Sequence, residues 1–304
     1  FAQGFAQNVR LDGEVANDGA GDAPARVDAG ALHVARAVGA EVAHVHTKAG
    51  LCEVNGFNRF EITGADRHAF MDRMSCSFVP KKDGRVGLVY LLNEQGMVKS
   101  EATVANLPAS DRGPERMWYG SAAASEYHDM DWLRAHMRAD EDVQIRSLTN
   151  DMTILVLAGP DARAVLQACA RGDWSNDAFP FLQVRECESG FAAATVMRVS
   201  FSGELAYEIH VPNANLYSAY HALRGAGEAH GLRLFGARAV ESMRMEKGYL
   251  HWKSDLITEF DPFETALDRF VKMDKDFVGK AALEARQAKG LGAKLVSLKV
   301  DIDT

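Results

Sequence analysis

The 304-residue sequence has few cysteines, no long apolar run and no excess of basic residues. Its four cysteines lack the paired spacing of a disulfide framework or a metal site, which indicates reduced thiols that serve packing. No apolar stretch approaches the roughly 18–20 residues of a transmembrane helix, and no signal peptide opens the sequence. A formal net charge of −8 argues against nucleic acids and anionic membranes as partners. These observations predict a cytoplasmic location, in a bacterial cytosol or a mitochondrial matrix.

Several motifs that carry well-known chemistry are also missing. No phosphate-binding loop or dinucleotide fingerprint follows a predicted strand, and neither HExxH nor G-x-S-x-G occurs. His44 and His46 could offer a metal pair, but polar positions at the end of a helix are the simpler interpretation. The sequence therefore predicts no metal site.

The residues that are present predict a large core. Hydrophobic residues make up 47% of the chain, enough for one large domain or two to three smaller ones. Residues 1–30 have no sustained period, and we interpret them as a linker or the remnant of an upstream region. Two later segments share a strand, a glycine and then a helix: NRFEITGADRHAFMDRM and DMTILVLAGPDARAVLQACA. This shared pattern predicts two α/β units of related design.

Local patterns also predict individual helices and a hairpin. Helical spacing of apolar residues is found over residues 32–45, around 216–223 and over 237–247. In the first of the two related units, Asp66 is expected to cap a helix that buries Ala69, Phe70 and Met74. GLVYLLNEQGMVKSEATVANL predicts a hairpin that turns at Asn93–Gly96.

The last residues alternate like a strand. In KLVSLKVDID one face would carry Val296, Leu298, Val300 and Ile302. A lone terminal strand with an apolar face needs partners. The sequence is therefore expected to stop inside a further β domain.

Three polar features lie within apolar patterns. SFSGELAYEIHVP predicts two short strands that bend at Gly203, with Tyr207 and Ile209 on one face and Glu208 on the other. Glu101 lies in the alternating strand MVKSEATV, and two arginines, Arg238 and Arg244, lie on the helix GARAVESMRMEKGY. From the residues alone, solvated carboxylates and surface ion pairs are the simpler interpretation.

Several separated motifs together resemble the aminomethyltransferase (glycine cleavage T-protein) family, and most of all the folate-binding part of dimethylglycine and sarcosine dehydrogenases. These motifs are LLNEQGMVKSEATV, ILVLAGPDARAVL, FPFLQV, RVSFSGELAYEIHVP, FGARAVESMRMEKGYLHWKSDL and DPFETALDRFVKMDKDFVGKAAL. The resemblance implies an α+β fold, a T-protein-like cloverleaf of two related α/β subdomains and the start of a C-terminal β-barrel domain. The expected division is 1–30 (linker or remnant), 31–150 (first folate-binding subdomain), 151–285 (second folate-binding subdomain) and 286–304 (start of the barrel).

The resemblance also implies a tetrahydrofolate site. Glu208 falls on the glutamate that holds the pterin, whose ring N–H and exocyclic amino group match an ionised carboxylate. Glu204, the other glutamate of that motif, is expected to be structural. Glu101 falls on the acidic residue beside folate N5 and is the expected catalytic residue. The other expected cofactor-binding residues are Arg238, Leu88, Trp118 and Phe201, the last at a position where T-proteins usually have tyrosine.

The function implied by the resemblance is tetrahydrofolate-dependent one-carbon transfer. Folate would capture the carbon released by oxidative N-demethylation of a small methylated amine of the dimethylglycine or sarcosine type, as 5,10-methylenetetrahydrofolate. FAD is expected only in a domain absent from this chain, the flavin domain of the parent chain. Glutamate instead of aspartate at position 101 favours this branch. Two alternatives stay open: a free-standing aminomethyltransferase or folate-dependent demethylase without flavin, and a non-catalytic folate-binding module.

Overall fold

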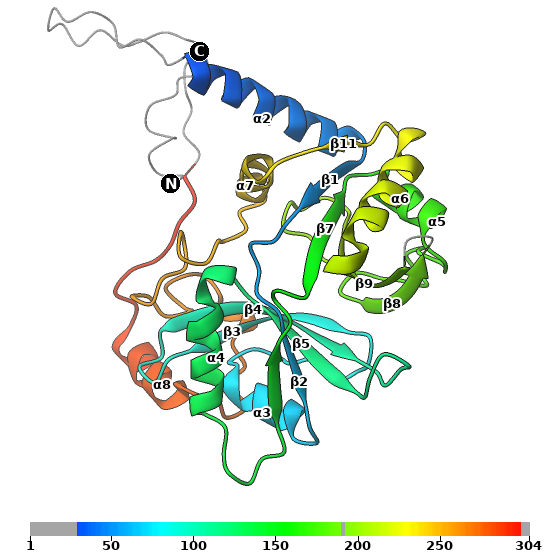
Figure 1. Ribbon diagram of the computed structural model, residues 1–304. Helices are drawn as coiled ribbons and strands as arrows, with labels where there is room; N and C mark the ends of the chain where they lie inside the picture. The colour runs from blue at the N-terminus through cyan, green and yellow to red at the C-terminus, as the bar shows by residue number, and fades with distance from the viewer. Residues whose placement is uncertain (1–28, 190–191, 299–304) are drawn as a thin grey trace, which may run out of the picture.

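The computed structural model describes residues 29–189 and 192–298, which form two sheets flanked by helices (Figure 1). One sheet contains β1 (Gly50–Glu53), β7 (Met152–Ala158), β8 (Val184–Ser189), β9 (Ala192–Met197), β10 (Ala206–Pro212) and β11 (Arg233–Leu234), in the order β11-β1-β7-β10-β9-β8. The other contains β2 (Phe60–Thr63), β3 (Val86–Leu92), β4 (Val98–Leu107), β5 (Arg116–Gly120) and β6 (Gln144–Ser147), in the order β3-β4-β5-β2-β6.

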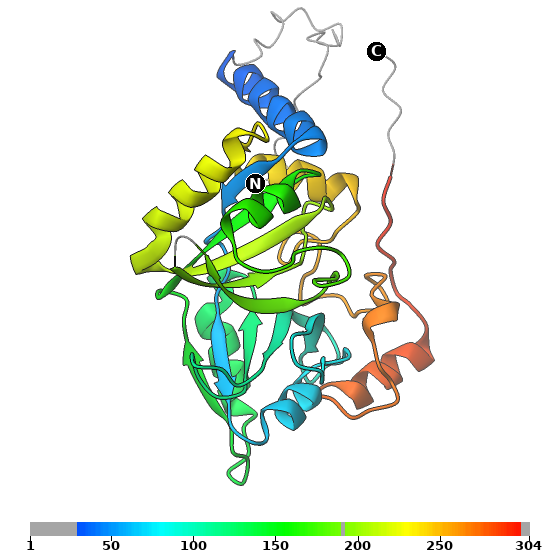
Figure 2. The same cartoon turned by 90° about the vertical axis from the view of Figure 1, so that its right-hand side faces the viewer.

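The helices connect and cover these strands. They are α2 (Ala29–Thr47), α3 (Arg67–Met74), α4 (Glu126–Ala135), α5 (Ala162–Cys169), α6 (Leu216–Glu228), α7 (Ala237–Glu246) and α8 (Lys280–Lys289). Short 3-10 helices span Ala123–Ser125, Asn213–Asn215 and Asp268–Phe270. Within the described residues, no helix combines the length and the apolar character needed to cross a membrane. Figures 1 and 2 show α2 and α3 at opposite ends of the molecule.

The six-stranded sheet packs helices against both of its faces. On one face, Tyr207, Ile209 and Val211 of β10 are buried in a cluster with side chains of α5 and α6. On the other face, α2 and α7 contribute Val45 and Met243 to a cluster around β1 and β7. Because side chains alternate along a strand, the second face also carries Glu208 and His210 of β10.

Two helices, α3 and α4, cover one face of the five-stranded sheet, and α8 packs at the β3–β4 hairpin through Leu283. On the covered face, α3 and α4 pack on Phe60, Val104 and Tyr119. The opposite face carries Trp118, which lies in a buried cluster with Val184 and Met197 of the six-stranded sheet. The two sheets therefore meet on the faces that bear Trp118 and Glu208.

The predicted strand–glycine–helix pattern is present twice. Gly64 and Gly159 have φ angles of 103° and 108° and precede α3 and α5. A Cβ atom on Gly64 would lie 2.0 Å from the carbonyl oxygen of Asp142, and one on Gly159 would lie 1.9 Å from that of Lys48. Both turns therefore require glycine, because another residue would be strained and would also clash with backbone.

Local details differ from the sequence predictions. In α3, Phe70 and Met74 are buried as predicted, but Ala69 is exposed and Met71 is buried. Asp66 stands at the N-cap without a capping bond, because its Oδ2 accepts a hydrogen bond from the backbone N–H of Asp142 at 2.9 Å. Of the two strands predicted around Gly203, only β10 is present. The predicted helices over 32–45, 216–223 and 237–247 and the hairpin at Asn93–Gly96 are confirmed.

The predicted terminal strand is not present where the structure describes it. Val296 and Leu298 are exposed and lie outside any strand, while Val300 and Ile302 lie outside the described residues, as do residues 1–28. The predicted division at residue 150 stays a prediction. One strand crosses it, because β1 precedes residue 150 yet pairs with β7 in the six-stranded sheet.

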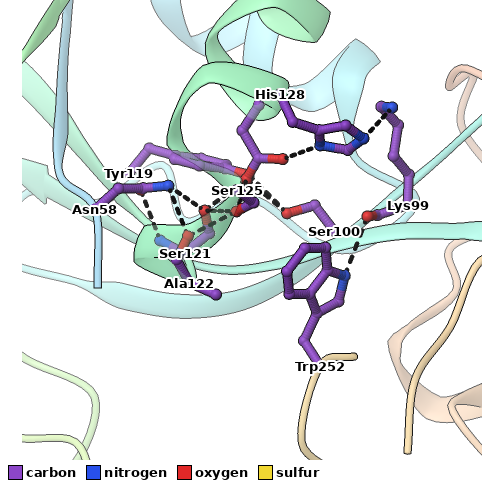
Figure 3. Close-up of polar contacts among 10 residues, drawn as sticks. Asn58, Lys99, Ser100, Tyr119, Ser121, Ala122, Ser125, His128 and Trp252 are labelled. Atoms are coloured by element: carbon purple, nitrogen blue, oxygen red, sulfur yellow. Dashed lines mark hydrogen bonds and ion pairs between the residues drawn. The ribbon is translucent and has the colours of Figure 1, made fainter. Parts of the chain in front are cut away.

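A buried carboxylate joins α4 to the five-stranded sheet. Asp129 is 1% exposed, and its Oδ2 accepts hydrogen bonds from four hydroxyl groups (Figure 3), those of Ser100, Tyr119, Ser121 and Ser125. Its Oδ1 lies 3.0 Å from Nδ1 of His128, whose Nε2 lies 2.9 Å from Nζ of Lys99. Such a converging set of donors compensates the carboxylate for the loss of water.

This network predicts a measurable loss of stability when one carboxylate oxygen of Asp129 is replaced by an amide NH₂. We expect Asp129→Asn to lower the free energy of unfolding by about 2 kcal/mol, because an amide NH₂ donates where hydroxyl groups also donate. Urea unfolding measures the difference. Asp131→Asn, at an exposed position of the same helix, is the control and should unfold like the original chain. Equal stability of all three proteins would contradict this account of the network.

Candidate functional site

A pocket lies where the two sheets meet. Glu208 and His210 of β10, Thr103 of β4, Trp118 of β5 and Arg59 from the segment before β2 are among the residues that line it. Its cavity volume is about 40 Å³, enough for water molecules but much less than a pocket that encloses a small ligand. A larger ligand can therefore enter only if side chains at the pocket move.

Glu208 is oriented in this pocket by a histidine. The alternation of β10 puts Glu208 and His210 on the same face, and His210 Nε2 lies 3.2 Å from Glu208 Oε2. His210 is buried, and its ring centroid lies 5.6 Å from that of Trp118. Burial lowers the pKa of His210, while the hydrogen bond and the charge of Glu208 act to raise it. A neutral His210 that donates from Nε2 leaves Nδ1 as an acceptor, and Nδ1 is buried without a partner.

Arg59 also lines the pocket, and the sequence analysis did not identify it. The side chain is 3% exposed, and its Nη2 donates a hydrogen bond to the carbonyl oxygen of Met152 at 2.6 Å. Its Nε and Nη1 atoms are buried without a partner. Burial lowers the pKa of Arg59, and the nearby charge of Glu208 opposes this. The sequence signal that could have identified Arg59 is its position directly before the apolar residues of β2. A charged side chain next to buried positions needs a hydrogen-bonding partner or a ligand.

Glu101 lies on the same face of the five-stranded sheet as Trp118. In the β3–β4 pairing, Tyr90 is opposite Glu101 and Leu88 is opposite Thr103, so alternation brings Leu88 and Glu101 to one face. Burial raises the pKa of Glu101 to about 7; a hydrogen bond with Tyr90 lowers it and the charge of Asp255 raises it. Glu101 Oε2 is buried without a hydrogen-bond partner.

A loop after α7 approaches Glu101 and Phe201. Arg244 Nη1 donates to Asp255 Oδ2 at 2.6 Å and holds the loop to α7. The indole N–H of Trp252 donates to the carbonyl oxygen of Lys99 in β4 at 3.1 Å. The ring centroid of His251 lies 6.1 Å from that of Phe201. Phe201 therefore lies next to the loop that carries Asp255. The same loop is bonded through Trp252 to β4, which carries Glu101.

The remaining residues singled out in the sequence lie elsewhere. Arg238 is exposed in the first turn of α7 and does not line the pocket, so its role toward folate stays a prediction. Glu204 Oε1 lies 3.0 Å from His46 Nδ1 and 3.4 Å from Lys247 Nζ, which connects the turn before β10 to α2 and the end of α7. In the part of the chain that the structure describes, no cluster of His, Cys, Asp and Glu forms a metal site.

The donors and acceptors of this region fit the edge of a pterin. Glu208 supplies a carboxylate for neighbouring N–H groups, and Arg59 supplies unpartnered N–H donors in the same pocket. The site nevertheless is too small for the whole bicyclic ring, and Trp118 and His210, which lie against each other, are the side chains that we expect to move. Glu101 is on the neighbouring sheet surface rather than in the pocket itself.

Comparison with known proteins shows the family of the chain. Residues 22–275 match the model of the family described as the GCVT N-terminal domain. The chain belongs to the GCVT family. This GCVT chain is 34% identical over 271 residues to mitochondrial dimethylglycine dehydrogenase of Rattus norvegicus. The aligned region covers 88% of the chain and 31% of that protein. It is 30% identical over 264 residues to mitochondrial sarcosine dehydrogenase of Homo sapiens. This alignment covers 83% of the chain and 29% of that protein.

The GCVT chain therefore spans about a third of the length of these curated relatives. Its fold resembles the crystal structure of the glycine cleavage system aminomethyltransferase T from Bartonella henselae, with a TM-score of 0.71 and 24% identity. That similarity covers 83% of this chain and 67% of the other. The predicted α+β, T-protein-like fold is confirmed, and neither sheet closes into a barrel within residues 29–189 and 192–298. The GCVT chain is an aminomethyltransferase-like domain related to dimethylglycine and sarcosine dehydrogenases.

Proposed function

We propose that this domain binds tetrahydrofolate between its two sheets and captures on it the carbon of an oxidised N-methyl amine of the dimethylglycine or sarcosine type. The observation that carries this proposal is the placement of two carboxylates, Glu208 in the pocket and Glu101 on the facing sheet, in a chain of the GCVT family. The product would be 5,10-methylenetetrahydrofolate. The oxidation itself is assigned to a flavin domain outside residues 1–304.

Glu208 has the binding role in this proposal. Its carboxylate accepts hydrogen bonds from the ring N–H and the exocyclic amino group of the pterin, and both bonds are charge-assisted. His210 is a positioning residue, because its Nε2–H holds one oxygen of that carboxylate. Trp118 and Leu88 supply apolar surface on the facing sheet, and Phe201 contributes an aromatic ring at the loop that carries Asp255.

Glu101 has the chemical role. When bound, tetrahydrofolate supplies a nucleophilic N5 amine that accepts the one-carbon unit. A carboxyl group with a pKa of about 7 can both hold and release a proton at neutral pH. In its ionised form, Glu101 stabilises positive charge that develops beside it, and its unpartnered Oε2 is available for that purpose.

Titration calorimetry of the chain with tetrahydrofolate and, separately, with FAD tests the proposal. We expect tetrahydrofolate to bind with a 1:1 stoichiometry and FAD not to bind. Because Trp118 lines the pocket, tryptophan fluorescence should change on addition of tetrahydrofolate, and the change should be smaller in Trp118→Phe. Trp174→Phe, a change in the core away from the pocket, is the control. A folded chain that binds no tetrahydrofolate would overturn the proposed function.

A further inference from the structure

Arg59 is a buried cation with bonding capacity that the protein does not use. Its Nη2 is engaged by the carbonyl oxygen of Met152, whereas Nε and Nη1 have no partner and no contact with water. A buried donor without an acceptor costs about 1–3 kcal/mol. Nη2 fixes the side chain in place, so the cost of the two free donors is retained until an acceptor enters the pocket.

The charge of Arg59 and that of Glu208 act in the same small pocket. Both residues line it, and the Glu208 charge contributes to the electrostatic environment of Arg59. The pair is not a simple internal ion pair, because the unpartnered atoms of Arg59 do not donate to Glu208. The pocket therefore offers carboxylate acceptors from β10 beside guanidinium donors from the segment before β2.

This arrangement matches a particular sequence of groups on a ligand edge. A 4-oxo pterin presents an amino group, a ring N–H and a carbonyl oxygen side by side, that is, two donors followed by an acceptor. The carboxylate of Glu208 takes the two donors, which leaves the carbonyl oxygen next to them. A carboxylate that binds the two donors leaves the pterin carbonyl oxygen without a hydrogen bond. An arginine N–H can supply that bond, and the bond is then charge-assisted.

We propose that Arg59 donates a hydrogen bond to the pterin carbonyl and thereby makes the site specific for 4-oxo over 4-amino pterins. This inference rests on the proposed function and adds a specificity-determining residue to it. A 4-amino group has a donor where the 4-oxo group has an acceptor. The guanidinium then faces an N–H donor, and both partners are left unpaired. Discrimination is strong when a site that is built to hydrogen-bond a group meets a ligand that lacks it.

The pair of folate and 4-amino-4-deoxyfolate tests the proposal when it is measured in the original chain and in Arg59 variants. The two ligands differ at position 4 and in the ring N–H at N3, and only the contribution from position 4 depends on Arg59. We expect the original chain to prefer folate by more than the roughly 10-fold to 100-fold that one charge-assisted hydrogen bond contributes, because the 4-amino compound also lacks the ring N–H that Glu208 accepts. In Arg59→Met this ratio should fall by about 10-fold to 100-fold through a loss of folate affinity. The preference that comes from the ring N–H held by Glu208 should remain. Arg59→Lys, which keeps a cationic donor, should restore part of the ratio.

The affinity ratio separates recognition from folding. Arg59 also anchors Met152, so Arg59→Met is expected to lose some stability, but a folding defect weakens both ligands equally and leaves their ratio unchanged. Arg146→Met removes an arginine that pairs with Glu61 and does not line the pocket, and it should keep the original ratio. An unchanged preference for folate in Arg59→Met would overturn the role of Arg59 and leave the proposed function standing. A chain that binds neither folate nor tetrahydrofolate would instead defeat the proposed function, and this inference with it.

Discussion

Glu101→Gln is expected to leave tetrahydrofolate affinity within about tenfold of the original value while it slows one-carbon capture by about 10²–10³-fold. The reason is that glutamine keeps the shape of the side chain but can neither carry the negative charge nor exchange a proton near neutral pH. Folate-dependent formaldehyde capture, measured in the longer protein that we propose to carry a flavin domain, gives the rate. Equal losses of binding and rate would indicate a plain binding contact and would favour a non-catalytic folate-binding module.

The same variant has a second readout in the isolated chain. Because the pKa of Glu101 is raised from 4.5 to about 7 in the folded protein, its stabilising contribution is present below pH 4.5 and is lost as the pH rises to about 7. A shift of this size corresponds to roughly 3 kcal/mol. Glu101→Gln should therefore gain stability relative to the original chain as the pH rises from about 4.5 to 7.5.

Urea unfolding at a series of pH values follows this gain. Glu228→Gln, exposed in α6, is the control and should show the same pH dependence as the original chain. If the stability difference between Glu101→Gln and the original chain does not change with pH, the pKa of Glu101 is not raised in the folded protein. Glu101 would then lose its assignment as the proton-exchanging group.

Glu208→Gln is expected to weaken tetrahydrofolate binding by about 2–3 kcal/mol, or roughly 30-fold to 150-fold. His210 Nε2 donates toward position 208 at 3.2 Å, so the amide oxygen of the substituted side chain should turn toward His210. The amide NH₂ then faces the two pterin donors. Titration calorimetry measures the loss, and circular dichroism checks that the fold is kept.

Glu204→Gln provides the matched control for this experiment. Glu204 belongs to the same sequence motif, but it contacts His46 and Lys247 and does not line the pocket. Its replacement should leave tetrahydrofolate affinity unchanged. Unchanged affinity in Glu208→Gln, or an equal loss in both variants, would show that Glu208 is not the pterin-holding residue.

Much of the local structure follows from the sequence because periodicity and turn chemistry are local properties. The alternation of Tyr207 and Ile209 with Glu208 predicted which side chains of β10 are buried and which face the pocket. Glycines at 64 and 159, each between a strand pattern and a helix pattern, predicted two strand-to-helix turns. The positive φ angles of both glycines confirm the turns. Alternation fails at Gly203, where the chain bends and only β10 continues.

The assembly of the site was decided by tertiary structure. β1 joins β7 across about 100 residues, and pairing at such a distance leaves no local trace in the pattern of either strand. The roles of Arg59 and Asp129 are equally invisible locally, because their partners come from distant segments such as Met152 and Ser100. The sequence by itself determined local elements such as α3, α5 and the β3–β4 hairpin, and the side chains that β10 turns inward. Only the packing of two sheets face to face decided that Glu208, Arg59 and Trp118 share one pocket and that Arg238 does not, because burial and electrostatic environment depend on contacts between segments far apart in the chain.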